Sequence, residues 1–286
     1  MGDKMKESYS PTVKSHDGNI YIRNINCFDL EQTLDCGQAF RWSKIDENIW
    51  HGIAFGKYLK IEQNDNEIIL YNTSLNDYLK IWKNYFDIDR NYLEIIEAIS
   101  INDTLKSASI LGKGIRILKQ DKWETLCSFI ISQNNNIPRI KGIIERMCEN
   151  FGEKLENGMY TFPTAEKIAS LSIEDLAPLR SGFRARYIID AATKVANKEI
   201  NFDILDSIPL EDAEKELMKI VGVGLKVADC ALLFSCSRID AFPKDVWIKR
   251  AMEKLFDGNL PECAIQYAGI VQQYIFYYAR TTKLNI

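Results

Sequence analysis

Short alternating runs of apolar residues give way to longer runs with helical spacing at about residue 75 of the chain. Before that point the runs are separated by turn-forming residues such as Gly37, Gly56 and Asn64. Runs of this kind are typical of β-strands, and connections this short allow only antiparallel pairing. The predicted strands cover residues 19–25, 39–43, 49–55, 58–63 and 67–71.

From residue 75 onwards, apolar residues recur three and four positions apart, which is the spacing of one helix face. Asp121, Thr164 and Ser172 stand directly before such runs and belong to the residue types that cap helix N-termini. The predicted helices cover residues 75–85, 92–98, 123–133, 137–151, 164–169, 173–179, 186–197, 210–220, 225–234, 246–256 and 262–280.

Together these patterns predict an α+β fold. An N-terminal antiparallel β-sheet domain with flanking helices is expected over residues 19–110, packed on a mostly α-helical body over residues 111–286. The polar first 18 residues are expected to form a flexible leader. Within the body, a helix-hairpin-helix motif is expected at about residues 210–234.

Composition excludes several classes of protein. With 286 residues, 46% of them hydrophobic and 27% charged, the chain resembles an ordinary globular protein, and no apolar run approaches the roughly 18 residues of a membrane span. The seven cysteines are scattered without a C-x-x-C pair, and there are only two histidines, which disfavours a metal or iron–sulfur cluster. Such cysteine usage fits a reducing cytoplasm, and no cofactor is expected.

Charge is informative only locally. The formal net charge of −4 does not indicate a nucleic-acid-binding protein. Residues 180–198, however, contain five basic side chains and one acidic side chain, Asp190. One such patch, together with backbone amides, is enough to hold a phosphate backbone, so composition neither supports nor excludes DNA binding.

Gly222 and Gly224 connect two predicted helices. Glycine permits positive φ and a very close approach of another backbone, and the free amides at the start of the second helix can hold a phosphate. The small Ala228 on the second helix allows the two helices to pack closely. A structural turn is the alternative interpretation, but the flanking helices favour a helix-hairpin-helix motif that binds phosphate.

Lys226, in the first turn of the second helix, is a candidate nucleophile. The positive end of the helix and partial burial would favour its neutral amine form, although the residue could equally extend to solvent or contact a phosphate. Cys230 lies four residues later on the same face, in the core or in the same pocket. Asp245 precedes another helix, so it is a helix cap and a candidate carboxylate partner of the lysine.

The residues around these positions resemble the 8-oxoguanine DNA glycosylase/AP-lyase family of the helix-hairpin-helix superfamily. The resemblance is carried by G-V-G-L-K-V-A-D-C at residues 222–230 and P-K-D-V at 243–246. Further similar blocks follow the family's order: C-G-Q-A-F-R-W at 36–42, residues 114–140 with N-N-N-I-P-R, G-F-R-A-R-Y at 182–187, and residues 267–276. The blocks extend over nearly the whole chain, as in a bacterial member of this family.

The resemblance implies an enzyme that flips 8-oxoguanine out of double-stranded DNA and excises it. Lys226 would attack the sugar to form a Schiff base, Asp245 would assist, and β-elimination would cleave the strand. The base pocket would be formed by Gly37, Cys230, Gln272 and Phe276. The chemistry requires no metal, although this superfamily can hold a structural cation on hairpin carbonyls, here those of Met218, Ile220 and Val223.

The resemblance also implies which residues contact DNA around the lesion. Asn134 would fill the gap left by the flipped base, and Arg139 and Arg184 would bind the orphaned cytosine. The remaining DNA contacts would come from Phe183, Gly222, Gly224 and Trp247. Phe183 and Trp247 depart from the tyrosine and histidine of animal members, which affects fine specificity more than chemistry.

Two other functions are compatible with parts of the pattern. A monofunctional alkylpurine-type glycosylase would share the aspartate but lack Lys226, and a non-catalytic helix-hairpin-helix DNA-binding protein would need neither Lys226 nor Asp245. The expected protein is a monomeric enzyme of the cytoplasm, associated with the nucleoid in a bacterium, without membrane contact.

Overall fold

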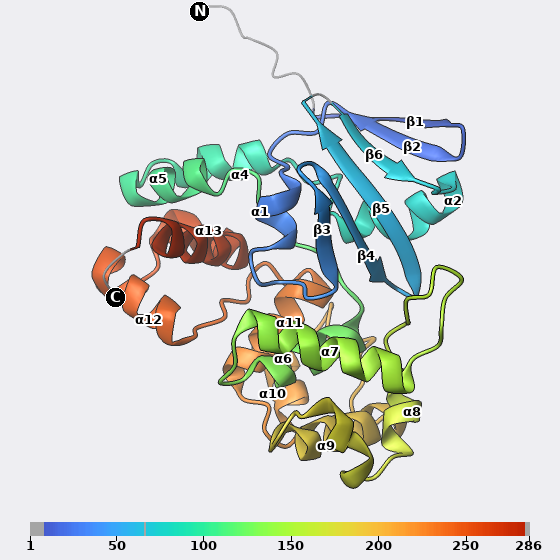
Figure 1. Ribbon diagram of the computed structural model, residues 1–286. Coiled ribbons are helices and arrows are strands. Elements are labelled where there is room, and N and C mark those ends of the chain that lie inside the picture. Colours follow the sequence, from blue (N-terminus) through green and yellow to red (C-terminus); the bar gives the residue numbers. More distant parts are fainter. Residues whose placement is uncertain (1–8, 66, 284–286) are drawn as a thin grey trace, which may run out of the picture.

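The computed structural model describes residues 9–65 and 67–283, and it has the predicted α+β architecture (Figure 1). A six-stranded antiparallel sheet has the order β1-β2-β6-β5-β4-β3. Its strands are β1 (Thr12–His16), β2 (Asn19–Arg23), β3 (Trp42–Asp46), β4 (Ile49–Ala54), β5 (Lys57–Asn64) and β6 (Glu67–Tyr71). None of the helices in the described ranges is long and apolar enough to cross a membrane.

One face of the sheet is buried because its strands alternate apolar and polar residues. Ile20 on β2 pairs with Leu70 on β6, and both are fully buried, whereas their neighbours along each strand are partly exposed. Aromatic residues cover this face: the Trp42 ring lies 6.3 Å from that of Trp82 and donates a hydrogen bond of 2.6 Å to the Tyr85 hydroxyl. The sheet therefore has an aromatic core of its own.

Strand β1 corrects the prediction of a flexible leader over residues 1–18. The strand pairs with β2 along its whole length, through a hairpin in which Asp17 and Gly18 both have positive φ, the conformation of a tight two-residue turn. The hydroxyl of Tyr9 also donates a hydrogen bond of 2.9 Å to the Ile88 carbonyl. The leader prediction is thus wrong for residues 9–18, and residues 1–8 lie outside the described residues.

The helical body fills the other end of the molecule in Figure 1. The helices of the described residues include one π-helical turn, η1, and two 3-10 helices, η2 and η3. In chain order they are α1 (Leu30–Leu34), α2 (Leu75–Asp77), η1 (Tyr78–Trp82), α3 (Lys83–Tyr85), α4 (Tyr92–Ile99), α5 (Asp103–Leu111), α6 (Lys122–Ser132), α7 (Ile137–Phe151), α8 (Ala165–Ala169), η2 (Glu174–Leu179), α9 (Arg184–Ala196), α10 (Leu210–Met218), α11 (Leu225–Cys236), α12 (Val246–Phe256), η3 (Glu262–Tyr267) and α13 (Ala268–Thr281).

Several predicted boundaries differ from the structure. Helices α1 and α5 were not predicted, and residues 39–41, predicted as strand, lie before β3. The residue before them, Gln38, is buried, and its side chain forms hydrogen bonds with the backbone of Thr33, Arg116 and Leu118. The predicted helix 262–280 is divided into η3 and α13. The predicted N-terminal domain, residues 19–110, contained α4 and most of α5. In the structure both helices belong to the core of the helical body, where α5 packs on α13 (Figure 1).

Candidate active site

A cavity of about 170 Å³ lies where α6, α11, α12, α13 and the loop before β3 meet. The sequence segments that form it are separated by up to about 240 positions, and the fold brings their polar groups to one wall. Six predicted site residues line it: Gly37, Lys226, Cys230, Asp245, Gln272 and Phe276. The predicted catalytic pair and the predicted base pocket thus share one cavity.

Lys226 is the second residue of α11 and is partly buried at the cavity wall. Its Nζ lies 3.5 Å from the Ser132 hydroxyl and 5.2 Å from the centre of the Phe129 ring. No carboxylate of residues 9–65 and 67–283 forms an ion pair with it within 4.0 Å. The amine is therefore held by a hydroxyl and an aromatic face, which leaves it open toward a ligand.

Asp245 is the N-cap of α12, and its Oδ1 accepts a hydrogen bond of 2.7 Å from the Ile248 amide. The interpretation of this residue as a helix cap is thus confirmed. The same carboxylate lines the cavity with Lys226. Because the cap fixes the side chain and no ion pair within 4.0 Å joins it to Lys226, the carboxylate is available to a ligand in the cavity.

The other cavity residues are suited to enclose a flat, polar-edged molecule. Gly37 has φ +90°, a conformation that favours glycine. Burial raises the pKa of the Cys230 thiol to about 11, partly opposed by the nearby Lys226, so the thiol is neutral at neutral pH and contributes packing. Gln272 and Phe276 lie four residues apart on α13, which places an amide and an aromatic ring on one helix face.

Sequence patterns predicted no role for several other residues that line the cavity, among them Phe40, Phe129, Ser132 and Gln273. Phe129 stacks on Phe234 at 5.4 Å and meets the edge of Phe40 at 5.8 Å, so it joins the cavity wall to the core. Its helical spacing is that of an ordinary core residue. Gln273 offered a signal, since two adjacent glutamines interrupt the apolar sequence of α13.

The hairpin between α10 and α11 uses its two glycines differently. Gly222 has φ +81°, and a Cβ there would lie 2.5 Å from the Tyr187 ring. Gly224, the N-cap of α11, has φ −106° and an open space where a Cβ would be. The first glycine is thus required by the fold, whereas the second leaves the free amides of α11 accessible to a phosphate.

The predicted cation-binding carbonyls lie in the same hairpin. The Ile220 carbonyl already accepts a hydrogen bond of 3.1 Å from the Val223 amide. The Lys194 ammonium donates to the adjacent Lys219 carbonyl at 2.7 Å. A carbonyl keeps a second lone pair, so the hydrogen bond to Ile220 does not by itself prevent cation binding, and the structural cation stays a prediction.

The residues predicted at the opposite base gather around the turn between α6 and α7. Asn134 is exposed there in the left-handed conformation, with φ +47°. Arg184 is 2% exposed, and its guanidinium donates to the carbonyls of Gln133 and Asn134, so in this structure it supports the turn. Its contact with a base stays a prediction. Arg139 and Phe183 are exposed beside this turn.

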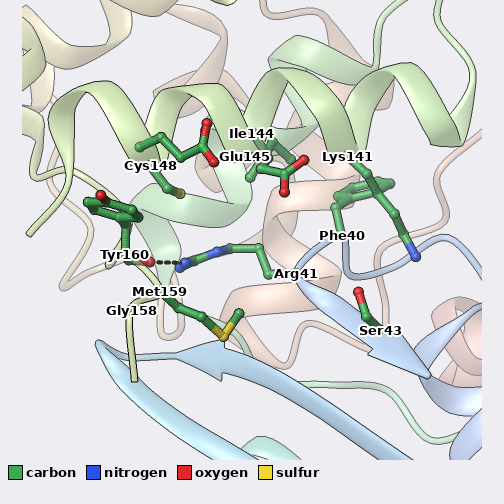
Figure 2. A pocket seen from close by; sticks show the side chains of 11 residues that line it. Phe40, Arg41, Ser43, Lys141, Ile144, Glu145, Cys148, Gly158, Met159 and Tyr160 are labelled. Carbon is green, nitrogen blue, oxygen red and sulfur yellow. Dashed lines mark hydrogen bonds between the residues drawn. The ribbon is translucent and has the colours of Figure 1, made fainter. Parts of the chain in front are cut away.

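Two further cavities flank the site. One, of about 730 Å³, adjoins the first through Asp245 and Phe276 and is lined by the exposed Trp247. The other, of about 260 Å³, lies beneath α7 and holds Arg41, which donates to the Tyr160 carbonyl (Figure 2). Neither of these two cavities is lined by Lys226. The predicted nucleophile thus belongs to the first of the three cavities.

Comparisons with known proteins agree with this geometry. Residues 20–126 match the model of the 8-oxoguanine DNA glycosylase N-terminal domain, and residues 127–260 match that of the HhH-GPD superfamily of base excision DNA repair proteins. The N-glycosylase/DNA lyase of Saccharomyces cerevisiae is 32% identical over 253 residues, which are 79% of this chain and 67% of the yeast protein.

Two solved structures resemble the chain over almost its full length. One is described as MBOgg1 in complex with a low-affinity DNA ligand; it is 41% identical, with a TM-score of 0.91 over 96% of this chain and 99% of its own. The other is the Clostridium acetobutylicum 8-oxoguanine glycosylase/lyase with double-stranded DNA containing cytosine opposite 8-oxoguanine, 37% identical, with a TM-score of 0.89 over the same shares. The chain therefore belongs to the 8-oxoguanine DNA glycosylase family, within the HhH-GPD superfamily.

Proposed function

We propose that the protein is a bifunctional DNA glycosylase and AP lyase that removes 8-oxoguanine from DNA in base excision repair. The observation that carries this function is the position of Lys226 and Asp245 on the wall of one cavity whose other residues can enclose a base. A monofunctional glycosylase would not need the lysine, and a DNA-binding module would not need the cavity. The relatives described above carry the names of this activity.

The reaction uses the cavity residues in sequence. A base must leave the duplex to reach Lys226, because the helix encloses it until it is flipped. The amine then forms a bond to C1′ of the sugar as the bond from C1′ to the base breaks, and the Asp245 carboxylate stabilises the positive charge that develops on the sugar. The aminal formed in this way becomes a Schiff base when the bond between C1′ and O4′ of the sugar breaks and a proton moves from the nitrogen to O4′. Loss of a C2′ proton from the Schiff base then breaks the bond from C3′ to the 3′ phosphate, which leaves, and the strand is cleaved.

We further propose that the protein acts as a monomer on double-stranded DNA in the cytoplasm, at the nucleoid in a bacterium. Gly224 opens the N-terminus of α11 to a phosphate, and three exposed side chains are the proposed DNA contacts, those of Asn134, of Arg139 in the first turn of α7 and of Phe183. Gly37 would recognise the N7–H that 8-oxoguanine has and guanine lacks. The resemblance to the family implies these residue roles, and the position of Gly37 at the cavity supports the role given to it.

Borohydride trapping tests the nucleophile. Wild-type protein with an 8-oxoguanine duplex should give a covalent protein–DNA adduct, and Lys226→Gln should give none, because the amide side chain cannot form a Schiff base. Lys244→Gln is a matched control, since Lys244 is an exposed lysine directly after Pro243 and does not line the cavity. An adduct that persists in Lys226→Gln contradicts the assignment of the nucleophile, and wild-type protein that releases no 8-oxoguanine contradicts the function.

A further inference from the structure

Gln273 is a second amide in the base cavity, directly after Gln272 on α13. Both side chains are 5% exposed, and the Gln273 Nε2 donates a hydrogen bond of 2.7 Å to the Gln272 Oε1. Adjacent residues of a helix usually point in different directions, about 100° apart. Two consecutive glutamines that reach one cavity and bond to each other therefore form a single recognition element, which we call the glutamine pair.

The Oε1 of Gln273 is buried without a partner. Among the described residues it belongs to a small set of buried side-chain oxygen and nitrogen atoms that lack a hydrogen bond. A buried acceptor left unpaired is costly in free energy, so such an atom on a side chain that lines the cavity fits a donor supplied by a ligand. The unpaired oxygen is thus a second observation, independent of the cavity, that points to a bound molecule.

The edge of a guanine-type base has more donors than Gln272 alone can serve. The N1–H and the exocyclic 2-amino group together present three N–H donors along that edge. The Gln272 Oε1 has two lone pairs, and one of them already accepts from Gln273. In a cavity that excludes water, the remaining donors need another acceptor, and the Gln273 Oε1 supplies it.

We propose that Gln273 is a specificity-determining residue whose Oε1 accepts a hydrogen bond from the exocyclic 2-amino group of the flipped base. Its Nε2 holds the amide of Gln272 in a fixed orientation at the same time. This inference rests on the proposed function, since it concerns the base that the cavity takes. The hydrogen bond from the 2-amino group to Gln273 would distinguish guanine-type lesions from purine lesions that lack this group.

A pair of substrates and a pair of variants test this contact. The substrates are duplexes with 8-oxoguanine or with 8-oxohypoxanthine, which differs only in lacking the 2-amino group, and base release is measured under single-turnover conditions. Gln273→Met removes the acceptor but keeps the length of the side chain. Gln266→Met makes the same change at an exposed glutamine of η3, outside the cavity.

We expect Gln273→Met to lower kcat/KM about tenfold more on 8-oxoguanine than on 8-oxohypoxanthine, because only 8-oxoguanine is left with a buried unpaired 2-amino donor, whereas loss of the Nε2 hydrogen bond to Gln272 affects both substrates alike. Cleavage of a preformed abasic site, which contains no base, should be unchanged in both variants. Equal losses on both substrates would show a merely structural role, and no loss on 8-oxoguanine would show no role; either result overturns the proposal.

The same measurements separate this proposal from the proposed function. If wild-type protein releases no 8-oxoguanine, the function itself is wrong. If it releases 8-oxoguanine and Gln273→Met discriminates between the two substrates as well as wild type does, only the role of Gln273 is wrong. A melting temperature of Gln273→Met close to that of wild type shows that the variant is folded, as expected when an apolar side chain replaces a buried, partly unpaired amide.

Discussion

The same substitution, Gly→Ala, should have different effects at the two hairpin glycines: a loss of stability at Gly222 and a loss of DNA affinity at Gly224. At Gly222 an alanine would have to adopt φ +81°, which costs about 1–2 kcal/mol for a residue with a Cβ. That Cβ would also lie 2.5 Å from the ring of Tyr187, and overpacking of this kind costs about 1–3 kcal/mol. We therefore expect Gly222→Ala to lower the free energy of unfolding by about 2–4 kcal/mol after the smaller entropy of the unfolded alanine chain is included.

Gly224→Ala should leave the fold almost unchanged. The backbone there has φ −106°, and nothing lies within 4 Å of the position of a Cβ. Alanine is a poorer N-cap than glycine, so the cost should stay below about 1 kcal/mol. The added methyl would instead occupy the space through which a phosphate approaches the free amides of α11, and we expect DNA affinity to fall about tenfold.

Thermal unfolding and DNA binding distinguish the two effects. At about 2 °C per kcal/mol for a chain of this size, the melting temperature should fall by about 4–8 °C in Gly222→Ala and by less than about 2 °C in Gly224→Ala. Affinity for an 8-oxoguanine duplex is measured by fluorescence anisotropy in a Lys226→Gln background, so that no turnover occurs. Wild-type stability in Gly222→Ala, or wild-type affinity in Gly224→Ala, would refute the reasoning for that glycine.

Two further substitutions separate stability from chemistry. Asp245→Asn keeps a good N-cap for α12 but removes the charge, so base release should fall strongly while the melting temperature stays unchanged. Asp245→Ala should in addition lower the free energy of unfolding by about 1 kcal/mol. Equal activity of Asp245→Asn and wild type would refute this reasoning. Burial raises the pKa of Glu124 from 4.5 to about 7, despite Arg41 beside it. The folded protein therefore keeps this proton at a pH where the unfolded chain loses it, so the melting temperature should decline as the pH rises from 4.5 to 7. Glu124→Gln should make this decline less steep, and a decline as steep as that of wild type would contradict the role of Glu124.

The shared position of Lys226 and Asp245 at one cavity could be predicted because both residues belong to compact sequence motifs. Lys226 is the second residue after the hairpin glycines, and Asp245 stands directly before an amphipathic helix. Neighbouring residues in the sequence were therefore enough to identify both positions. The strands with alternating burial were predictable for the same reason, since β4, β5 and β6 each repeat with period two. Local pattern and final position agree at these residues.

Other features depend on contacts that no local pattern encodes. Residues 12–16 are mostly exposed in the structure and have no apolar alternation, so their membership of the sheet follows from pairing with β2 alone. The inward position of Arg184 depends on carbonyls about 50 positions earlier in the chain, at Gln133 and Asn134. Its motif indicated that the residue matters, but the motif did not contain the turn that the guanidinium supports.

Phe129 and Ser132 show why the surroundings of the nucleophile were the hardest part to predict. Both lie on α6, 94 or more positions before Lys226, and the spacing of α6 is that of a core helix. Phe129 serves the core and the site at once, because one ring stacks on Phe234 and lies beside the lysine amine. Substitution of Phe129 would therefore change stability and chemistry together. Ser132, only partly buried and in contact with the amine through its hydroxyl, is the position at which the surroundings of Lys226 can be altered with the core left intact.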